Sequence, residues 1–298
     1  MKVAGENIRI EGRLLRIARL DAEGYLFVEK PEPLLDALRK SGERIDLFTF
    51  TQRLPQSVPL YSFPREWDNF AALPVSTFDH WWTQQIDNKT RNMARKAEKK
   101  GVTLRVVPFD DALVQGIWEI YNECPVRQGR PFTHFGKDLE TVRREEATYL
   151  DSSVFIGAFL GDAMIGFVKL VSNETRTQAG LMNIVSMIRH RDKAPTNALV
   201  AQAVRYCAEH QIPYLVYSNF AYGKRQKDSV TDFKENNGFQ KIDVPRYYVP
   251  LTHFGKLALR LRLHHRWVDL FPQSLVARLR DLRNAWNNRK FRSVTENS

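Results

Sequence analysis

The sequence contains very little cysteine: Cys124 and Cys207 are the only two among its 298 residues. They form no Cys-x-x-Cys pair, and no histidine lies near them at a spacing that suits a metal ion. A fold that depends on disulfide bonds is therefore excluded, and we expect no metal cofactor. Both cysteines are typical of a protein that works in the reducing cytoplasm.

Long apolar runs are absent as well. No window approaches 18 consecutive apolar residues, and the opening stretch MKVAGENIRIEG lacks the apolar segment of a signal peptide. Internal repeats and low-complexity tracts are also missing, which argues against a repeat architecture. The remaining composition, 43% hydrophobic and 11% aromatic residues, predicts a globular chain of about two domains by its length.

Basic residues are abundant and give a formal net charge of +11, which favours polyanionic partners. Within residues 88–100, six basic residues accompany one acidic residue at positions suited to a helix. Arg91 and Arg95 in this segment are candidate substrate-binding residues for a phosphate-bearing ligand. The alternative is a solvated helix face, and the sequence leaves both open.

The order of predicted elements is the most informative feature. Residues 7–52 indicate short strands around one helix at 31–42, a βαβ-like start, and residues 76–101 predict one long helix capped by Ser76 or Thr77. A regular series follows: a strand at 102–109, two helices within 110–150, and three strands within 153–188, two of them around the turn Gly161-Asp162. A loop and helix within 189–211, a strand at 213–218, a short helix within 228–239 and a strand at 246–251 complete it.

This order resembles the acyl-CoA N-acyltransferase (GNAT) fold over residues 102–251, about half the chain. The stretch NKTRNMARKAEKKGV is similar to the basic helix before the second acyltransferase-like domain of Fem-type peptidoglycan aminoacyl-transferases, and DFKENNGF with YYVPL resembles their closing FK motif and last strand. The resemblance implies an α/β fold with a mixed central sheet flanked by helices. It further implies a degenerate first GNAT-like domain with a basic connector helix at 1–100, an acyltransferase domain at 101–251 and a basic helical tail at 252–298.

The resemblance also implies where an acyl donor binds. Acyl-CoA enzymes of this fold hold the donor where two strands splay apart, with its pyrophosphate on the N–H groups of the following helix N-terminus. Arg191 matches the family pattern there, but Ala194 and Thr196 stand where glycines are common, and Fem-type enzymes, which take aminoacyl-tRNA, lack that glycine loop. The donor thus stays open between acyl-CoA, an acyl carrier protein and aminoacyl-tRNA. The candidate donor-binding residues are Asn183, Ile184, Arg189, Arg191, Lys193, Thr196 and Asn197.

Catalysis of acyl transfer to an amine requires stabilisation of a tetrahedral oxyanion. Lys234 matches the lysine of the FK pair, for which the resemblance implies a catalytic role in polarising the ester carbonyl; the structural alternative is an exposed lysine on a short helix. Tyr222 is the alternative acid, and Ser218 and Asn219 are candidate substrate-binding residues at the carboxyl end of their strand. The strand around Asn183 offers no carboxylate, so proton removal through water is expected.

The tail from residue 252 to 298 carries ten Lys or Arg against three Asp or Glu, with an apolar stripe formed by Leu275, Leu279, Leu282 and Trp286. It is predicted either to pack on the body or to bind an anionic membrane surface or tRNA, which leaves open a location at the inner face of the membrane. The predicted function is an N-acyltransferase that moves an acyl or aminoacyl group to an amine of a small molecule, amino sugar or cell-envelope precursor. The alternative is an inactive polyanion-binding module, and the acceptor and oligomeric state stay open.

Overall fold

The computed structural model describes residues 1–21, 27–28, 30–173, 175–221 and 229–265, and these residues form two compact units. Unit 1 comprises residues 1–73, 216–234 and 239–265, and unit 2 comprises residues 74–215 and 235–238. The predicted domain boundaries, after residues 100 and 251, differ from this division. The chain passes through unit 1, builds unit 2 and then returns to unit 1 for its last strand.

Unit 2 is built on an antiparallel sheet in the order β11-β10-β9-β6. A tight turn with Gly161 in the left-handed region (φ +61°) joins β9 to β10, as the sequence predicted. The strands are β6 (Val102–Val107), β9 (Ser153–Leu160), β10 (Ala163–Ser172) and β11 (Ala179–Ser186); β12 (Tyr214–Asn219) begins in unit 2 and ends in unit 1. A two-stranded ribbon of β7 (Val126–Arg127) and β8 (Arg130–Pro131) lies outside this sheet.

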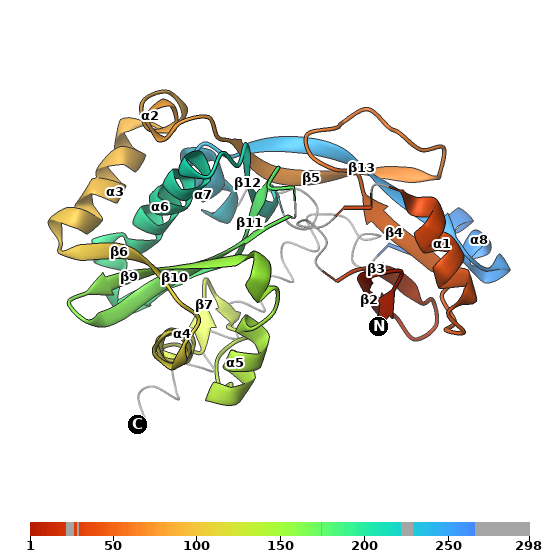
Figure 1. Ribbon diagram of the computed structural model, residues 1–298, viewed down its shortest axis with the longest axis horizontal. Helices are drawn as coiled ribbons and strands as arrows, with labels where there is room; N and C mark the ends of the chain where they lie inside the picture. Colours follow the sequence, from red (N-terminus) through yellow and green to blue (C-terminus); the bar gives the residue numbers. More distant parts are fainter. Residues whose placement is uncertain (22–26, 29, 174, 222–228, 266–298) are drawn as a thin grey trace. The chain divides into compact units, whose positions relative to one another are not determined.

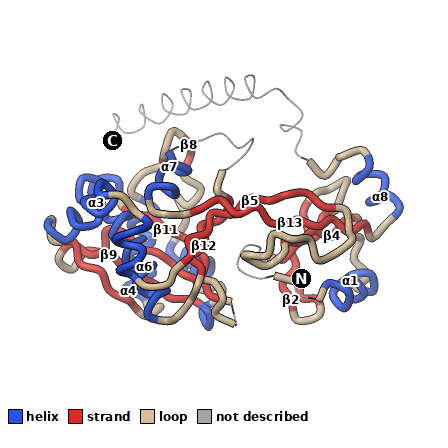
Figure 2. The backbone as a smooth tube through the Cα atoms, turned by 90° about the horizontal axis from the view of Figure 1, so that it is seen from above, coloured by secondary structure: helices blue, strands red, loops and turns tan. Residues whose placement is uncertain are grey.

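Helices cover both faces of this sheet, as Figure 1 shows. Alternation along the strands explains the two layers, since Phe155, Phe159 and Phe167 pack with α4, whereas Gly166, one residue away, approaches Leu199 of α6. The helices on one side are α4 (Asp111–Asn122) and α5 (Leu139–Glu146); on the other side α3 (Asn88–Lys99) and α6 (Pro195–Glu209) lie side by side (Figure 2). Aspartate side chains at Asp110 and Asp138 cap α4 and α5.

The predicted long helix at 76–101 is wrong in one respect, because it is broken in the middle. Thr77 caps a short α2 (Phe78–His80), which continues as a π-helix (Trp81–Gln85). Ile86 then adopts an extended conformation, and the Asp87 carboxylate accepts the N–H of Thr90 to begin α3. The basic segment is thus a helix with its own cap rather than the end of a longer one.

Unit 1 contains the strand order β1-β2-β3-β4-β13-β5. Its strands are β1 (Lys2–Val3), β2 (Glu6–Glu11), β3 (Ile17–Leu20), β4 (Leu47–Thr51), β5 (Arg65–Pro74) and β13 (Gln240–Pro250). The β3–β4 pair is parallel, and α1 (Pro31–Lys40) lies between the two strands in the sequence, which confirms the predicted βαβ start. Strand β13 pairs antiparallel with β4 through residues 246–250 and with β5 through residues 240–247.

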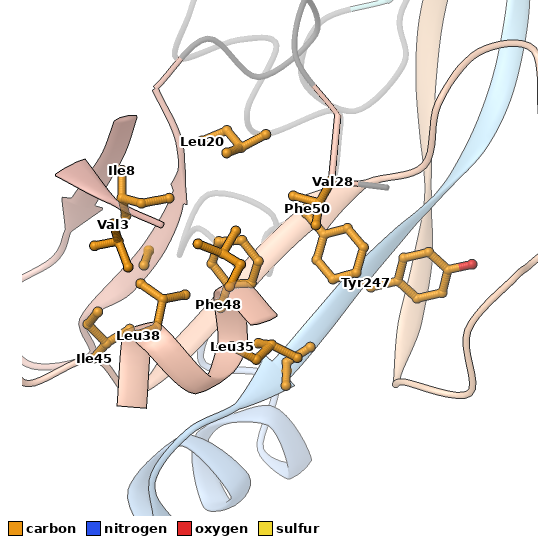
Figure 3. Packing of buried hydrophobic residues seen from close by; sticks show 13 residues of the cluster. Val3, Ile8, Leu20, Val28, Leu35, Leu38, Ile45, Phe48, Phe50 and Tyr247 are labelled. Atoms are coloured by element: carbon orange, nitrogen blue, oxygen red, sulfur yellow. The ribbon is translucent and has the colours of Figure 1, made fainter. Parts of the chain in front are cut away.

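The core of unit 1 is rich in aromatic side chains, as Figure 3 shows. Phe50 lies 5.2 Å from the ring of Tyr247, centroid to centroid, and 5.6 Å from that of Phe48. Leu35 and Leu38 of α1 close the cluster from the helix side. The hydroxyl of Tyr247 is buried too, and it donates a hydrogen bond to Gln52 Oε1.

Helix α8 (His253–Arg260) follows β13, and its Gly255 approaches the backbone of Asp46, the residue before β4. The buried Asp46 carboxylate joins three segments, since it accepts the backbone N–H of Arg16 and the hydroxyl of Thr252, and Thr252 caps α8. In the described part of the chain, no helix has the length and apolar character needed to cross a membrane. The predicted tail stripe lies in residues 266–298, outside the described residues.

Lys169 of β10 is a fully buried lysine in unit 2. Its ammonium donates to the backbone oxygens of Glu146 (2.8 Å) and Thr148 (2.7 Å), where α5 ends. Carbonyl groups at a helix end lack partners within the helix, and a cation there also offsets the helix dipole. Burial lowers the pKa of Lys169 to about 8, although the nearby Glu146 raises it.

We expect Gly255→Ala to destabilise the protein by about 1–3 kcal/mol, because a Cβ at this position would overlap the carbonyl oxygen of Asp46. Urea unfolding followed by circular dichroism measures this loss. Lys256→Ala, at the exposed neighbouring position, is the matched control. Equal stability of Gly255→Ala and the wild type would contradict the close approach of α8 to β4.

Lys169 also predicts a pH-dependent stability. Between pH 8 and 10.5 the unfolded chain keeps the Lys169 proton whereas the folded chain loses it, so the free energy of unfolding rises with pH in this window. The difference in this free energy between the wild type and Lys169→Met should therefore grow by about 3 kcal/mol between these pH values. Urea titrations at both pH values test this, with Lys99→Met as an exposed control. Parallel profiles for the wild type and Lys169→Met would contradict the lowered pKa.

Candidate active site

Lys234 lies on α7 (Ser229–Asn236) and is fully buried. Its ammonium donates to the backbone oxygen of Asn219 and lies 4.7 Å from the centroid of the Tyr217 ring. The alternative of an exposed lysine is therefore wrong. Burying an ammonium group is costly unless hydrogen bonds and electron-rich groups surround it, and the carbonyl and the ring face supply both.

The end of β12 has an unusual backbone where it meets Lys234. Ser218 adopts a left-handed conformation (φ +48°), which is rare for a residue with a side chain. Asn219 follows, and two further N–H groups are held by Asn69: that of Phe220 by its backbone oxygen and that of Ala221 by its side-chain oxygen. A strained strand end that is fixed by such bonds is typical of ligand-binding positions.

Asp68 and Arg246 hold the side chain of Asn219 in place. The Asn219 amide donates to Asp68 Oδ1 at 2.8 Å, and Arg246 donates to Asp68 Oδ2 through Nε (3.0 Å) and Nη2 (2.7 Å). All three side chains belong to unit 1 and are largely screened from solvent. Charge-assisted pairs of this geometry are among the stronger polar contacts in proteins.

The structure therefore brings three of the predicted residues together: Lys234, Ser218 and Asn219. Tyr222, the alternative acid, lies outside the described residues. Asp68, Arg246 and Tyr217 were missed by the sequence analysis. Tyr217 is two residues from Asn219, but Asp68 and Arg246 are 178 positions apart, and nothing in one sequence links them.

Asn183, a predicted donor-binding residue, lies in unit 2 beside a β-bulge. Lys169 pairs with Asn183 but the next residue, Leu170, pairs with Leu181, so Met182 is the extra residue. The amide of Asn183 donates to both carboxylate oxygens of Glu146, at 2.8 and 3.1 Å. The Asn183 side chain is thus held by hydrogen bonds to Glu146.

Glu146 is a buried carboxylate next to β11 that the sequence analysis did not find. It is 1% exposed, and its Oε1 also accepts the hydroxyl of Tyr121 at 2.8 Å. Burial raises the pKa of Tyr121 well above its usual value, and the charge of Glu146 raises it further. Strand β11 itself offers no carboxylate. Glu146 of α5, which lies 37 positions before Asn183 in the sequence, supplies one.

The predicted phosphate loop forms a 3₁₀ helix (Ile188–Lys193) that leads into α6. Glu123 caps this loop, since its carboxylate accepts the N–H groups of Ile188 (2.6 Å) and Arg189 (2.9 Å). Ala194 adopts the left-handed conformation (φ +53°) that the glycine of the family pattern would adopt freely. Arg127 contacts Glu123 and donates to the backbone oxygen of Ser186 at 2.7 Å, which ties the loop to α4 and β11.

The remaining loop candidates are arranged around the α6 N-terminus. The Thr196 hydroxyl is hydrogen-bonded to that of Ser186 (2.7 Å), and α6 begins with Pro195 and has no side-chain cap. Arg189 and Arg191 are exposed. Lys193 forms an ion pair with Asp192, with 3.3 Å between Nζ and Oδ1. Asn197 and Ile184 are half-buried on α6 and β11. Their donor-binding role stays a prediction.

Arg91 and Arg95, the candidate phosphate ligands of the basic helix, contact the preceding turn. Arg91 Nη1 donates to the backbone oxygens of Trp82 (2.7 Å) and Ile86 (2.8 Å), and its Nη2 donates to Asn88. Arg95 stacks 5.3 Å from the ring of Trp82. Both guanidinium groups thus fasten α3 to the π-helix, and a phosphate-binding role stays a prediction.

Comparisons with known proteins add information at the level of the fold. No protein-family model matches the sequence. A search of curated proteins found no match either.

Solved structures do match. The C-terminal domain (DUF2156) of a putative lysylphosphatidylglycerol synthetase from Agrobacterium fabrum is 14% identical, with a TM-score of 0.56 over 87% of this chain and 86% of that one. L-PGS from Bacillus licheniformis is 14% identical, with a TM-score of 0.56 over 89% and 88%. FemX is 12% identical, with a TM-score of 0.45 over 74% and 69%. The two matches with TM-scores of 0.56 are GNAT-fold proteins, so the chain has the GNAT fold.

Proposed function

We propose that this protein is an acyltransferase that moves an aminoacyl or acyl group from an ester or thioester donor to an amine of a small molecule, amino sugar or cell-envelope precursor. The fold supports the reaction class. The observation that carries the proposal is the fully buried ammonium of Lys234 at the carboxyl end of β12. Ligands usually bind at this end of the strands in open α/β sheets.

Lys234 suits the chemistry of acyl transfer. Attack by the amine turns the donor carbonyl into a tetrahedral oxyanion, and a positive charge already fixed beside it stabilises that intermediate. The Asn219 carbonyl and the face of Tyr217 fix the ammonium before the substrate arrives. The Asp68–Arg246 pair fixes Asn219 in turn, so the charge needs little reorganisation during the reaction.

The donor loop favours an aminoacyl ester over acyl-CoA. Ala194 and Thr196 carry side chains where the CoA-binding pattern has glycines, and Glu123 places a carboxylate on two N–H groups of this loop. A carboxylate repels the diphosphate of CoA, whereas it attracts the ammonium of an aminoacyl group. One structural neighbour is the C-terminal domain of a protein named as a putative lysylphosphatidylglycerol synthetase, a name that describes an aminoacylated lipid product.

Donor identity is tested by incubating the purified protein with labelled aminoacyl-tRNAs, acyl-CoAs and acyl carrier protein thioesters, together with amine acceptors of the three classes. We expect transfer from aminoacyl-tRNA. Transfer from acyl-CoA alone would overturn the donor preference. Absence of transfer and of binding with every donor would overturn the function, and a preferred nucleic-acid ligand in that case would favour the polyanion-binding alternative.

We expect Lys234→Met to lower turnover by about a hundredfold or more, because it removes the charge that stabilises the oxyanion. Lys234→Arg should restore little activity, since a planar guanidinium does not fit a site shaped for a compact ammonium. Turnover with the active donor is measured beside donor affinity and the circular dichroism spectrum, which show whether binding and folding are kept. Lys256→Met on the exposed face of α8 is the control. Wild-type turnover of a folded Lys234→Met would remove Lys234 from the mechanism.

A further inference from the structure

Two adjacent histidines and a glutamate meet in unit 1, and none of the three is used in the proposed reaction. Glu66 lies near the start of β5, and His264 and His265 follow α8, about 200 positions later in the chain. Their ligand atoms all lie within 4.8 Å of one another. Both imidazoles approach the same carboxylate oxygen: Nε2 of His264 is 3.1 Å and Nε2 of His265 is 2.9 Å from Glu66 Oε1.

These distances are close to those between the ligands of a tetrahedral zinc ion. Zinc binds imidazole nitrogen and carboxylate oxygen at about 2.0–2.2 Å, which places neighbouring ligands about 3.3–3.5 Å apart. The observed separations from nitrogen to oxygen need to open by only a few tenths of an ångström. Two histidines and one carboxylate are also a known donor set for zinc, with a fourth position left for water.

The surroundings hold these side chains ready for a metal. The side chain of His264 is 3% exposed, and its ring packs 4.6 Å from that of Tyr248 and 4.2 Å from that of His265, centroid to centroid. Tyr248 also contacts the second oxygen of Glu66 at 3.5 Å, at the limit of a hydrogen bond. The two outer groups, Glu66 and His265, are 39% and 30% exposed, so an ion has access from solvent.

Hydrogen bonding alone accounts poorly for this arrangement. Two imidazoles share one carboxylate oxygen, and both present Nε2 to it. Both contacts fall on the same oxygen, and holding a second ring against the first costs side-chain entropy. A divalent ion between the three ligand atoms replaces both contacts by stronger bonds.

We propose that Glu66, His264 and His265 form a binding site for a zinc ion, with water in the fourth position. On binding, each Nε2 lone pair coordinates the ion, and the proton of each neutral ring resides on Nδ1. Because the carboxylate contributes one negative charge, the complex has a net charge of +1. The ion joins β5 to the residues after α8. His265 directly precedes the basic segment 266–298 in the sequence. Its three ligands do not include Lys234, and the proposal does not rest on acyl transfer.

Zinc titration of the metal-free full-length protein by calorimetry tests the proposal, together with the visible absorption of a Co²⁺-loaded sample. We expect one ion per chain, the intense bands of four-coordinate cobalt, and a rise in melting temperature with zinc, since an ion that binds only the folded chain stabilises it. His265→Gln and Glu66→Gln should each weaken zinc binding by about tenfold or more and remove the cobalt bands.

His253→Gln is the matched control, because His253 is an exposed histidine at the start of the same helix. It should bind zinc like the wild type. Circular dichroism shows whether each variant folds; His265, the more exposed histidine, keeps the test valid if Glu66→Gln does not fold. Absence of stoichiometric zinc binding, or equal zinc affinity in the wild type, His265→Gln and His253→Gln, would overturn the site.

Discussion

Unit 1 depends on the insertion of β13 between β4 and β5. The eleven residues of β13 pair antiparallel with β5 through residues 240–247 and with β4 through residues 246–250, so a segment from near the end of the chain joins these two strands. Successive side chains of β13 have different roles. Tyr247 fills the aromatic core, while Arg246 reaches Asp68 beside the candidate active site. Without this strand, neither the core nor the position of Asn219 would be defined.

The same pairing links the two sites of unit 1 through β5. Asp68 of β5 orients Asn219 and hence the carbonyl that receives the Lys234 ammonium. Two residues earlier on the same side of the strand, Glu66 receives His264 and His265. One strand thus supplies a carboxylate to each site, and its register against β13 sets where both carboxylates lie.

Buried charges mark both units, and each is fixed by backbone carbonyls or side-chain donors. Lys234 binds the carbonyl at a strand end, and Lys169 binds carbonyls at a helix end. Glu146 is held by Asn183 and Tyr121. Burying such groups is unfavourable unless every charge is paired, so these residues fix the strand end of β12 and the bulge of β11 more sharply than apolar packing would. In unit 1 this places the Lys234 ammonium where the proposed acyl transfer would require a positive charge.

Hydrophobic periodicity, the Gly161 turn and helix caps such as Asp110 act within a few residues, so the sequence predicted most elements of residues 102–251 and their order. It missed the ribbon of β7 and β8 and the first half of β13. It also indicated Lys234, through the resemblance to the FK motif, and Ser218 and Asn219, through their place at the end of a strand. The sequence did not predict the break at Ile86, where the π-helix ends and Arg91 donates to the Ile86 carbonyl. It did not predict strand β5 either. The folded chain alone shows that β13 enters between β4 and β5, that Asp68 meets Arg246, that Glu146 accepts from Asn183 and that Glu66 meets two histidines. These contacts join residues 37 to about 200 positions apart, and such pairings are set by strand register and core packing of the whole chain, which leave no local pattern in a single sequence.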